Sequence, residues 1–177
     1  MTDSTRRLTL LLAGLGCFAS IAFSYFYLEK TLYLSPCPLC IMQRIAFALI
    51  GLMFLLDAAL WPQGTVGSVV MKTGKYLSIF FGIGLAARHL HIQSLPEGEV
   101  PACGLDFYGL MENTPFFSGL AKAMMGTGDC ATKDTWPLEG MFALTIPTWS
   151  MILFIALLLA CIVSERRRTQ APKNHFS

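Results

Sequence analysis

Long apolar runs alternate with shorter polar segments along this chain of 177 residues. The runs Leu8–Leu28 and Met141–Ser164 contain no charged residue. Both are long enough to cross the hydrocarbon core of a bilayer, since a helix needs about 20 residues to do so. Pro147 is expected in the first turn of the second helix, where proline is tolerated. The pattern therefore predicts a membrane-spanning helix near each end of the chain.

Two further apolar runs lie in the middle of the chain and are shorter. Each contains 12 uncharged residues, the first between Arg44 and Asp57 and the second between Lys75 and Arg88. By length alone, both could be buried helices of a soluble domain. We interpret them as spans, because long basic side chains at helix ends can reach the membrane surface and neighbouring helices can pair with the remaining polar groups.

These patterns predict a single all-α membrane domain, residues 1–165, built as a four-helix bundle. The expected spans are residues 8–28, 41–61, 71–92 and 145–164. The expected outer loops are residues 29–40 and 93–144, and residues 166–177 are expected to form a basic, disordered tail. Composition supports this class, because only 14% of the residues are charged, whereas soluble domains have about 25%. A net charge of +2 gives no indication of a nucleic-acid partner.

The second outer loop contains the pattern of a short amphipathic helix. Thr114 is expected to cap this helix and Pro115 to occupy its first position. Phe116, Leu120 and Met124 follow at intervals of four residues and share one helical face. We expect the helix to lie on the membrane surface, although an ordinary packing helix would show the same pattern.

Basic residues are distributed unequally between the two sides of the predicted bundle. The side with both termini and the loop 61–75 carries eight, namely Arg6, Arg7, Lys72, Lys75, Arg166, Arg167, Arg168 and Lys173. The other side carries three, namely Lys30, Lys122 and Lys133. Cytoplasmic segments of membrane proteins are enriched in Lys and Arg. The termini are therefore expected in the cytoplasm and the two outer loops outside it.

The six cysteines fall into two groups. Cys17 and Cys161 lie within predicted spans, where a free cysteine usually behaves as a small hydrophobic residue. The other four are divided equally between the two outer loops, as Cys37 and Cys40 and then Cys103 and Cys130. The compartment outside the cytoplasmic membrane is oxidising, so disulfides can persist there.

Three interpretations of the four outer cysteines remain open from their spacing. They could bind zinc, form two inert structural disulfides, or form two redox-active pairs that exchange electrons. Zinc is disfavoured, because structural zinc sites usually join two closely spaced pairs and 26 residues separate Cys103 from Cys130.

The surroundings of Cys40 favour exchange. Cys40 is expected at the start of a helix, where free N–H groups and the helix dipole favour an anion. Arg44 lies one turn further along the same face. Both effects stabilise a thiolate. An arginine just inside the membrane edge is costly and is expected either to reach the membrane surface or to form a structural salt bridge. On a sharper interpretation, Arg44 also faces a polar ligand such as a quinone carbonyl, where it would stabilise developing negative charge.

These residues carry a resemblance to the DsbB family of bacterial inner-membrane disulfide bond formation proteins. The similarity extends from about Leu8 to Val163. Its markers are residues 37–44 (Cys-Pro-Leu-Cys-Ile-Met-Gln-Arg), 101–104 (Pro-Ala-Cys-Gly) and 126–130 (Gly-Thr-Gly-Asp-Cys), with segments 88–93 and 147–149 also similar. A Cys-x-x-Cys pair alone is a weak signal. Four outer cysteines in this order, on four spans and with an arginine four residues after the second, form a specific combination.

The resemblance implies a thiol:quinone oxidoreductase that reoxidises a periplasmic DsbA-like thioredoxin-fold protein and supports disulfide formation in secreted proteins. Cys103 is the expected partner of that protein in a mixed disulfide. Cys130 would then attack Cys37, which frees Cys40 beside a quinone, ubiquinone or menaquinone, from the membrane pool. Arg44 and His89 are the candidate quinone-binding residues, and His89 is equally interpretable as an interfacial polar residue. No metal is expected.

Two other functions remain open. A vitamin K epoxide reductase-like protein also couples loop cysteines to a quinone-binding Cys-x-x-Cys pair. In that family the loop pair comes before the Cys-x-x-Cys pair, whereas here it comes after. A non-catalytic membrane scaffold with two structural disulfides would contain the same four outer cysteines.

Overall fold

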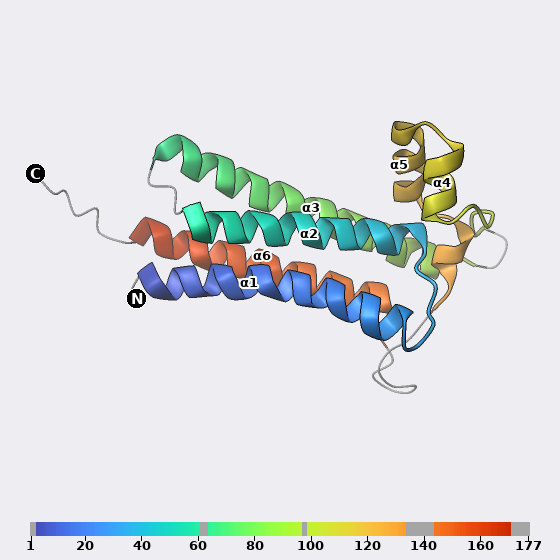
Figure 1. Cartoon of the computed structure of the whole chain (residues 1–177), viewed down its shortest axis with the longest axis horizontal. Coiled ribbons are helices and arrows are strands. Elements are labelled where there is room, and N and C mark those ends of the chain that lie inside the picture. Colours follow the sequence, from blue (N-terminus) through green and yellow to red (C-terminus); the bar gives the residue numbers. More distant parts are fainter. Residues whose placement is uncertain (1–2, 61–63, 97–98, 134–143, 171–177) are drawn as a thin grey trace, which may run out of the picture.

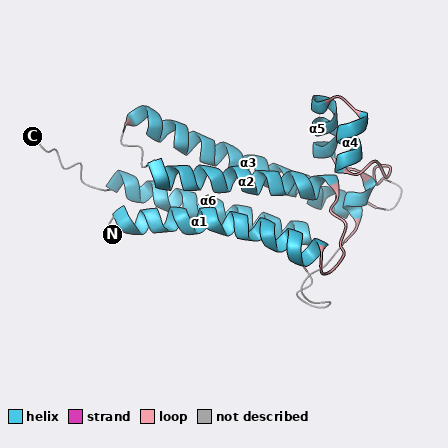
Figure 2. Ribbon diagram, viewed as in Figure 1, coloured by secondary structure: helices cyan, strands magenta, loops and turns pink. Residues whose placement is uncertain are grey.

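The computed structural model describes residues 3–60, 64–96, 99–133 and 144–170. Four long helices run side by side (Figure 1). They are α1 (Asp3–Phe23), α2 (Pro38–Leu60), α3 (Thr65–Ser94) and α6 (Ile146–Gln170). Helices make up the regular structure of the described residues (Figure 2), and four segments are long and apolar enough to cross a membrane. The prediction of an all-α bundle with four spans is confirmed.

Several helix ends differ from the expected bounds, and α1 begins at Asp3 rather than at Leu8. α2 begins at Pro38, so this helix already contains Cys40, and α3 begins at Thr65 rather than near residue 71. α6 continues through Gln170, so residues 166–170 of the expected tail are helical, while residues 171–177 lie outside the described residues. Arginine is a good helix former, which is consistent with the continuation of α6 through Arg166, Arg167 and Arg168.

One charged side chain from each long helix enters a buried network at the end of the bundle where α1 begins and α6 ends (Figure 1). Lys75 Nζ donates to Asp57 Oδ2 and to Glu165 Oε1, both at 2.6 Å. Arg6 Nη2 donates to the same oxygen of Asp57 at 3.1 Å. We call these four residues the charge network. Their opposite charges offset one another, which explains how the middle spans accommodate ionised groups next to the hydrocarbon.

Small and aromatic residues bring the helices together. Gly51 of α2 packs so closely on α1 that a Cβ there would lie 3.0 Å from the Cβ of Cys17. The rings of Phe47 and Phe154 stack with their centroids 4.2 Å apart. Small residues allow membrane helices to approach closely. Cys17 is buried in this contact, as expected of a cysteine that acts as a small hydrophobic residue.

The second outer loop forms two short helices, α4 (Phe107–Asn113) and α5 (Phe116–Met125), beside the opposite end of the bundle (Figure 1). The helix predicted after Pro115 is confirmed, but its capping differs. Pro115 itself is the N-cap, and the Thr114 hydroxyl donates instead to the carbonyl of Leu110 in α4. Phe116 and Phe117 are 65% and 83% exposed. Leu120 and Met124, which share the predicted apolar face with Phe116, instead pack against the core of the bundle.

Candidate functional site

The first cysteine pair lies at the start of α2. Cys37 directly precedes the helix and Cys40 lies in its first turn, after Pro38. Proline suits this turn because its nitrogen has no hydrogen left to satisfy. The two sulfur atoms are 3.2 Å apart. The helix start therefore holds the two thiols side by side.

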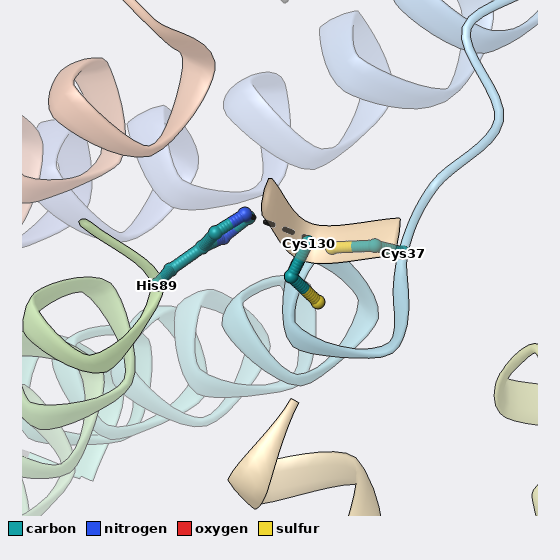
Figure 3. Close-up of side chains that lie close together, drawn as sticks. All are labelled: Cys37, His89 and Cys130. Carbon is teal, nitrogen blue, oxygen red and sulfur yellow. Dashed lines mark hydrogen bonds between the residues drawn. The ribbon is translucent and has the colours of Figure 1, made fainter. Parts of the chain in front are cut away.

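The second loop brings Cys130 to this pair. Cys130 lies in the short 3-10 helix η2 (Gly128–Ala131) and has no exposed surface. The side chains of Cys37, His89 and Cys130 converge from the start of α2, from α3 and from η2 (Figure 3). One sulfur or nitrogen atom of each lies within 4.8 Å of the others. We call these three side chains the donor cluster. It joins one cysteine from each of the two outer loops.

His89 faces the cysteines through one ring nitrogen and a glutamine through the other. Its Nε2 lies 3.8 Å from Cys37 Sγ, and its Nδ1 lies 3.2 Å from Gln43 Nε2. In this orientation of the Gln43 amide, its NH₂ group donates to Nδ1 of His89, and Nε2 carries the ring proton toward the sulfur. If the amide is turned, its oxygen accepts from Nδ1, and Nε2 becomes the acceptor. Both His89 and Gln43 are buried. His89 is thus placed to give a proton to a sulfur atom or to take one from it.

Cys103 lies on the exposed side of the same loop. The segment before it runs along the segment before Cys130, where Gly128 N donates to the Ala102 carbonyl at 3.2 Å. A side chain at residue 128 would collide with the carbonyl oxygen of Pro101. Close approach of these two backbones is therefore built into the loop. In this arrangement Cys103 is exposed and Cys130 is buried against the bundle.

A cavity of about 410 Å³ opens on the other side of the first pair, between α1, α2 and α6. Its walls are mostly apolar, and Cys40, Gln43, Arg44 and Trp149 are among the lining residues. Pockets for small organic ligands usually have volumes of roughly 300 to 1,000 Å³ and a few placed polar groups. His89 does not line this cavity; its ring lies instead beside Cys37, Gln43 and Cys130.

Arg44 is tied to the end of the first span. Its Nη1 donates to Glu29 Oε2 at 2.8 Å and its Nε donates to Ser24 Oγ at 3.1 Å. Both partners belong to η1 (Ser24–Glu29), a π-helix that continues α1. π-Helical turns are rare and often occur at functional sites. The structural salt bridge expected of Arg44 is present, and the same side chain lines the cavity.

The two cysteines that meet from different loops differ in acidity. The Cys37 thiol and backbone groups of Leu39 and Thr127 lower the pKa of Cys130 to about 6, against the opposing effect of burial. The pKa of Cys37 is raised, because hydrogen bonds to Cys130 and Cys40 and its burial favour the thiol. When both cysteines are reduced, Cys130 is therefore the thiolate and Cys37 the proton donor.

The donor cluster has the chemistry of a metal site as well as of a redox site. Two cysteine sulfurs and an imidazole are common zinc ligands, and Cys40 adds a further sulfur next to Cys37. A disulfide at either cysteine pair would consume one of these thiolates. Metal binding and disulfide chemistry therefore compete for the same atoms.

Several polar residues around the site escaped prediction from the sequence. The sequence did not identify Glu29 as the partner of Arg44, and it did not predict the contact of Gln43 with His89. A glutamine within an otherwise apolar span is a usable signal, because polar groups inside a membrane need a partner. Arg88 and Gln93 bracket His89 on α3 and contact the second loop.

Comparison with known proteins identifies the family of this chain. The family model described as "Disulfide bond formation protein DsbB" matches residues 6–164. A "Disulfide bond formation protein B" of Xanthomonas euvesicatoria is 34% identical over 169 residues, covering 96% of this chain and 95% of the relative. Proteins of the same name from Hahella chejuensis and Methylobacillus flagellatus are each 42% identical, over 82% and 77% of this chain and 82% and 80% of their own lengths. The chain belongs to the DsbB family of disulfide bond formation proteins.

Proposed function

We propose that this protein is a thiol:quinone oxidoreductase that reoxidises a periplasmic DsbA-like dithiol protein. One observation carries the proposal: Cys130 lies against Cys37, while Cys40 lines the 410 Å³ cavity. One end of the first pair thus faces the thiol that delivers electrons, and the other faces space for an acceptor. The proposal includes an inner-membrane location with both termini in the cytoplasm and both cysteine loops in the periplasm, as the distribution of basic residues favours.

The first step opens the loop disulfide. A thiolate of the partner attacks Cys103 of a Cys103–Cys130 disulfide; a sulfur–sulfur bond forms to Cys103 and Cys130 leaves as a thiolate. The exposure of Cys103 supports this choice of target. The second thiol of the partner then attacks its own sulfur in the mixed disulfide. The partner leaves oxidised and Cys103 becomes a thiolate.

The second step moves the electrons to the first pair. The Cys130 thiolate, which backbone groups of Leu39 and Thr127 stabilise, attacks Cys37 of a Cys37–Cys40 disulfide. The Cys37–Cys130 bond forms and Cys40 leaves as a thiolate at the N-terminus of α2, where the helix dipole favours an anion. Cys103 then attacks Cys130, which restores the loop disulfide and leaves Cys37 and Cys40 reduced.

The cavity beside Cys40 fits a quinone in size and lining. Its apolar walls suit a ring with a hydrocarbon tail, and Arg44 and Ser24 supply polar groups for the ring oxygens. When bound, a ubiquinone or menaquinone accepts two electrons from the first pair and takes up two protons. Glu29 holds the guanidinium of Arg44 in place, so its positive charge is fixed before negative charge develops in the cavity.

The test is quinone reduction by purified protein with a reduced DsbA-like partner, followed by quinone absorbance. The Cys40→Ser variant is expected to abolish turnover, and Cys161→Ser, at a buried position in α6, is the matched control that retains it. A membrane scaffold with structural disulfides predicts no quinone consumption by the unmodified protein. That result, or full activity of Cys40→Ser, would refute the proposal. The vitamin K epoxide reductase-like alternative gains no support, since the loop pair follows the Cys-x-x-Cys pair.

A further inference from the structure

Two side chains near the outer end of α3 hold the backbone on either side of Cys130. Arg88 Nε donates to the carbonyl oxygen of Met125 at 3.1 Å. Gln93 Nε2 donates to the carbonyl oxygen of Thr132 at 2.8 Å. The two acceptors lie five residues before and two residues after Cys130. Neither side chain takes part in the sulfur chemistry described above.

The Arg88 contact matches the electrostatics of a helix end. Met125 is the last residue of α5. The last carbonyls of a helix have no partner within it, and the helix dipole favours a cation there. The arginine on α3 therefore binds the C-terminal end of α5 as a charge-assisted hydrogen bond.

The Gln93 contact depends on the loop being in place. Gln93 is buried, and its Oε1 has no hydrogen-bond partner among the described residues. Among the described residues, the amide makes its hydrogen bond through Nε2 to the Thr132 carbonyl, and a buried amide without a partner is costly. Docking of the segment that follows η2 supplies this partner. The amide thereby favours the docked position of Cys130.

Close packing supports the same position between the two contacts. Gly126, directly after α5, has φ +78°, a conformation that favours glycine. A Cβ at this residue would lie 2.6 Å from side-chain atoms of both Leu39 and Ile92. The backbone at Gly126 thus packs against the first turn of α2 and the last turns of α3. A larger residue would hold the loop away from Cys37.

We propose that Arg88 and Gln93 are positioning residues that dock the second loop and hold Cys130 at Cys37 for electron transfer between the two cysteine pairs. This inference rests on the proposed function. It adds the contacts that hold the two cysteine loops together during electron transfer. Both residues bind backbone carbonyls through single hydrogen bonds, so the loop can be released when Cys130 must return to Cys103. His89 lies between them in the sequence and completes the donor cluster, so one short stretch of α3 both docks the loop and faces its sulfur.

The substitutions that test docking remove the donors and keep the shapes. Gln93→Glu retains the length of the side chain, but a carboxylate cannot donate to the Thr132 carbonyl. Arg88→Met retains the apolar stem without a donor, and Arg88→Lys retains the charge and should rescue part of the loss. His91→Ala is the matched control on α3, because that side chain is exposed.

The first measurement is trapping of the Cys37–Cys130 disulfide. In a Cys40→Ser/Cys103→Ser background, the azo oxidant diamide takes two electrons and two protons from Cys37 and Cys130, and the disulfide is followed by non-reducing electrophoresis. Gln93→Glu should slow its formation by roughly fivefold and Arg88→Met by roughly tenfold, as expected for loss of one neutral and one charge-assisted hydrogen bond. Equal rates in these variants and the His91→Ala control would overturn the proposal.

The second measurement separates docking from general stability. Dithiothreitol can reduce the Cys37–Cys40 disulfide directly, so quinone reduction with this small dithiol should keep its rate in Gln93→Glu and Arg88→Met, while turnover with the protein partner falls. Loss of both activities would mean that these side chains support the whole bundle, which overturns the proposal. If the unmodified protein reduces no quinone, the proposed function fails, yet the trapping experiment still decides whether Arg88 and Gln93 dock the loop.

Discussion

The low pKa of Cys130 depends on its neighbour in the other loop, and this dependence can be measured. The Cys37 thiol makes the largest contribution to lowering the pKa of Cys130, from its ordinary value of 9.0 to about 6. Cys37→Ala removes that donor, whereas Cys37→Ser keeps a hydroxyl in the same place. We therefore expect the pKa of Cys130 to rise in the alanine variant and to stay lower in the serine variant.

The size of the effect follows from the ionised fraction and the reactivity of the thiolate. At pH 6, a thiol with a pKa of about 6 is about 50% ionised, and a rise of two units would leave about 1%. A thiolate of higher pKa is more nucleophilic, by roughly eightfold over two units. The alkylation rate at pH 6 should therefore fall by roughly sixfold. The midpoint of the pH profile should move upward by about two units.

The assay is the pH dependence of iodoacetamide labelling in a Cys40→Ala/Cys103→Ala background, with the Cys130 peptide quantified by mass spectrometry. Each profile is read from its own midpoint, so slow access to the buried sulfur changes the amplitude and not the midpoint. Cys37→Ser reports whether any hydrogen-bond donor at this position suffices. An unchanged midpoint in Cys37→Ala would refute the contact between the two loops in the reduced protein.

Three further changes test other parts of the molecule. Asp57→Asn removes the negative charge that Arg6 and Lys75 share. It should lower the free energy of unfolding by about 3–5 kcal/mol, measured by denaturant titration in detergent. A loss below about 1 kcal/mol would show that the network is dispensable. Arg44→Met should raise the KM for quinone by roughly tenfold. Glu29→Gln should raise it by less, because the guanidinium of Arg44 keeps its contact with Ser24. If steady-state kinetics give both variants the KM of the unmodified protein, this wall of the cavity is not the binding site. Zn²⁺ should bind the fully reduced protein and stop turnover until a chelator is added. His89→Ala should weaken this inhibition. If Zn²⁺ binds the oxidised protein equally tightly, the donor cluster is not the site.

The four spans could be predicted because the membrane imposes a local rule. Each helix satisfies its own backbone and covers itself with apolar side chains, so a run of uncharged residues identifies a span without knowledge of its neighbours. The charge network shows where this rule stops. Asp57 is paired with a residue 51 positions away and Lys75 with one 90 positions away. The sequence indicated that such charges need partners, but only packing of the helices selects them.

The candidate site likewise has a part that local sequence predicts and a part that depends on packing of distant segments. Cys37, Cys40 and Arg44 lie within one turn or two of a single helix, so their spacing alone predicted that they share a site. The short helix after Pro115 was predicted for the same reason, whereas its capping was not, because the Thr114 hydroxyl had a competing acceptor in α4.

The position of Cys130 depends on contacts between distant segments and has no local signal. Its segment docks through backbone carbonyls, which every residue has, so the acceptors leave no trace in the sequence. The donors do leave one, because Arg88 and Gln93 are polar residues at the end of an apolar helix and need partners. For contacts of this kind, the sequence can therefore indicate the donors but not the acceptors. The proposed disulfide exchange between the two loops needs donors that stay fixed on α3. It also needs acceptors on a loop that can leave and carry Cys130 back to Cys103.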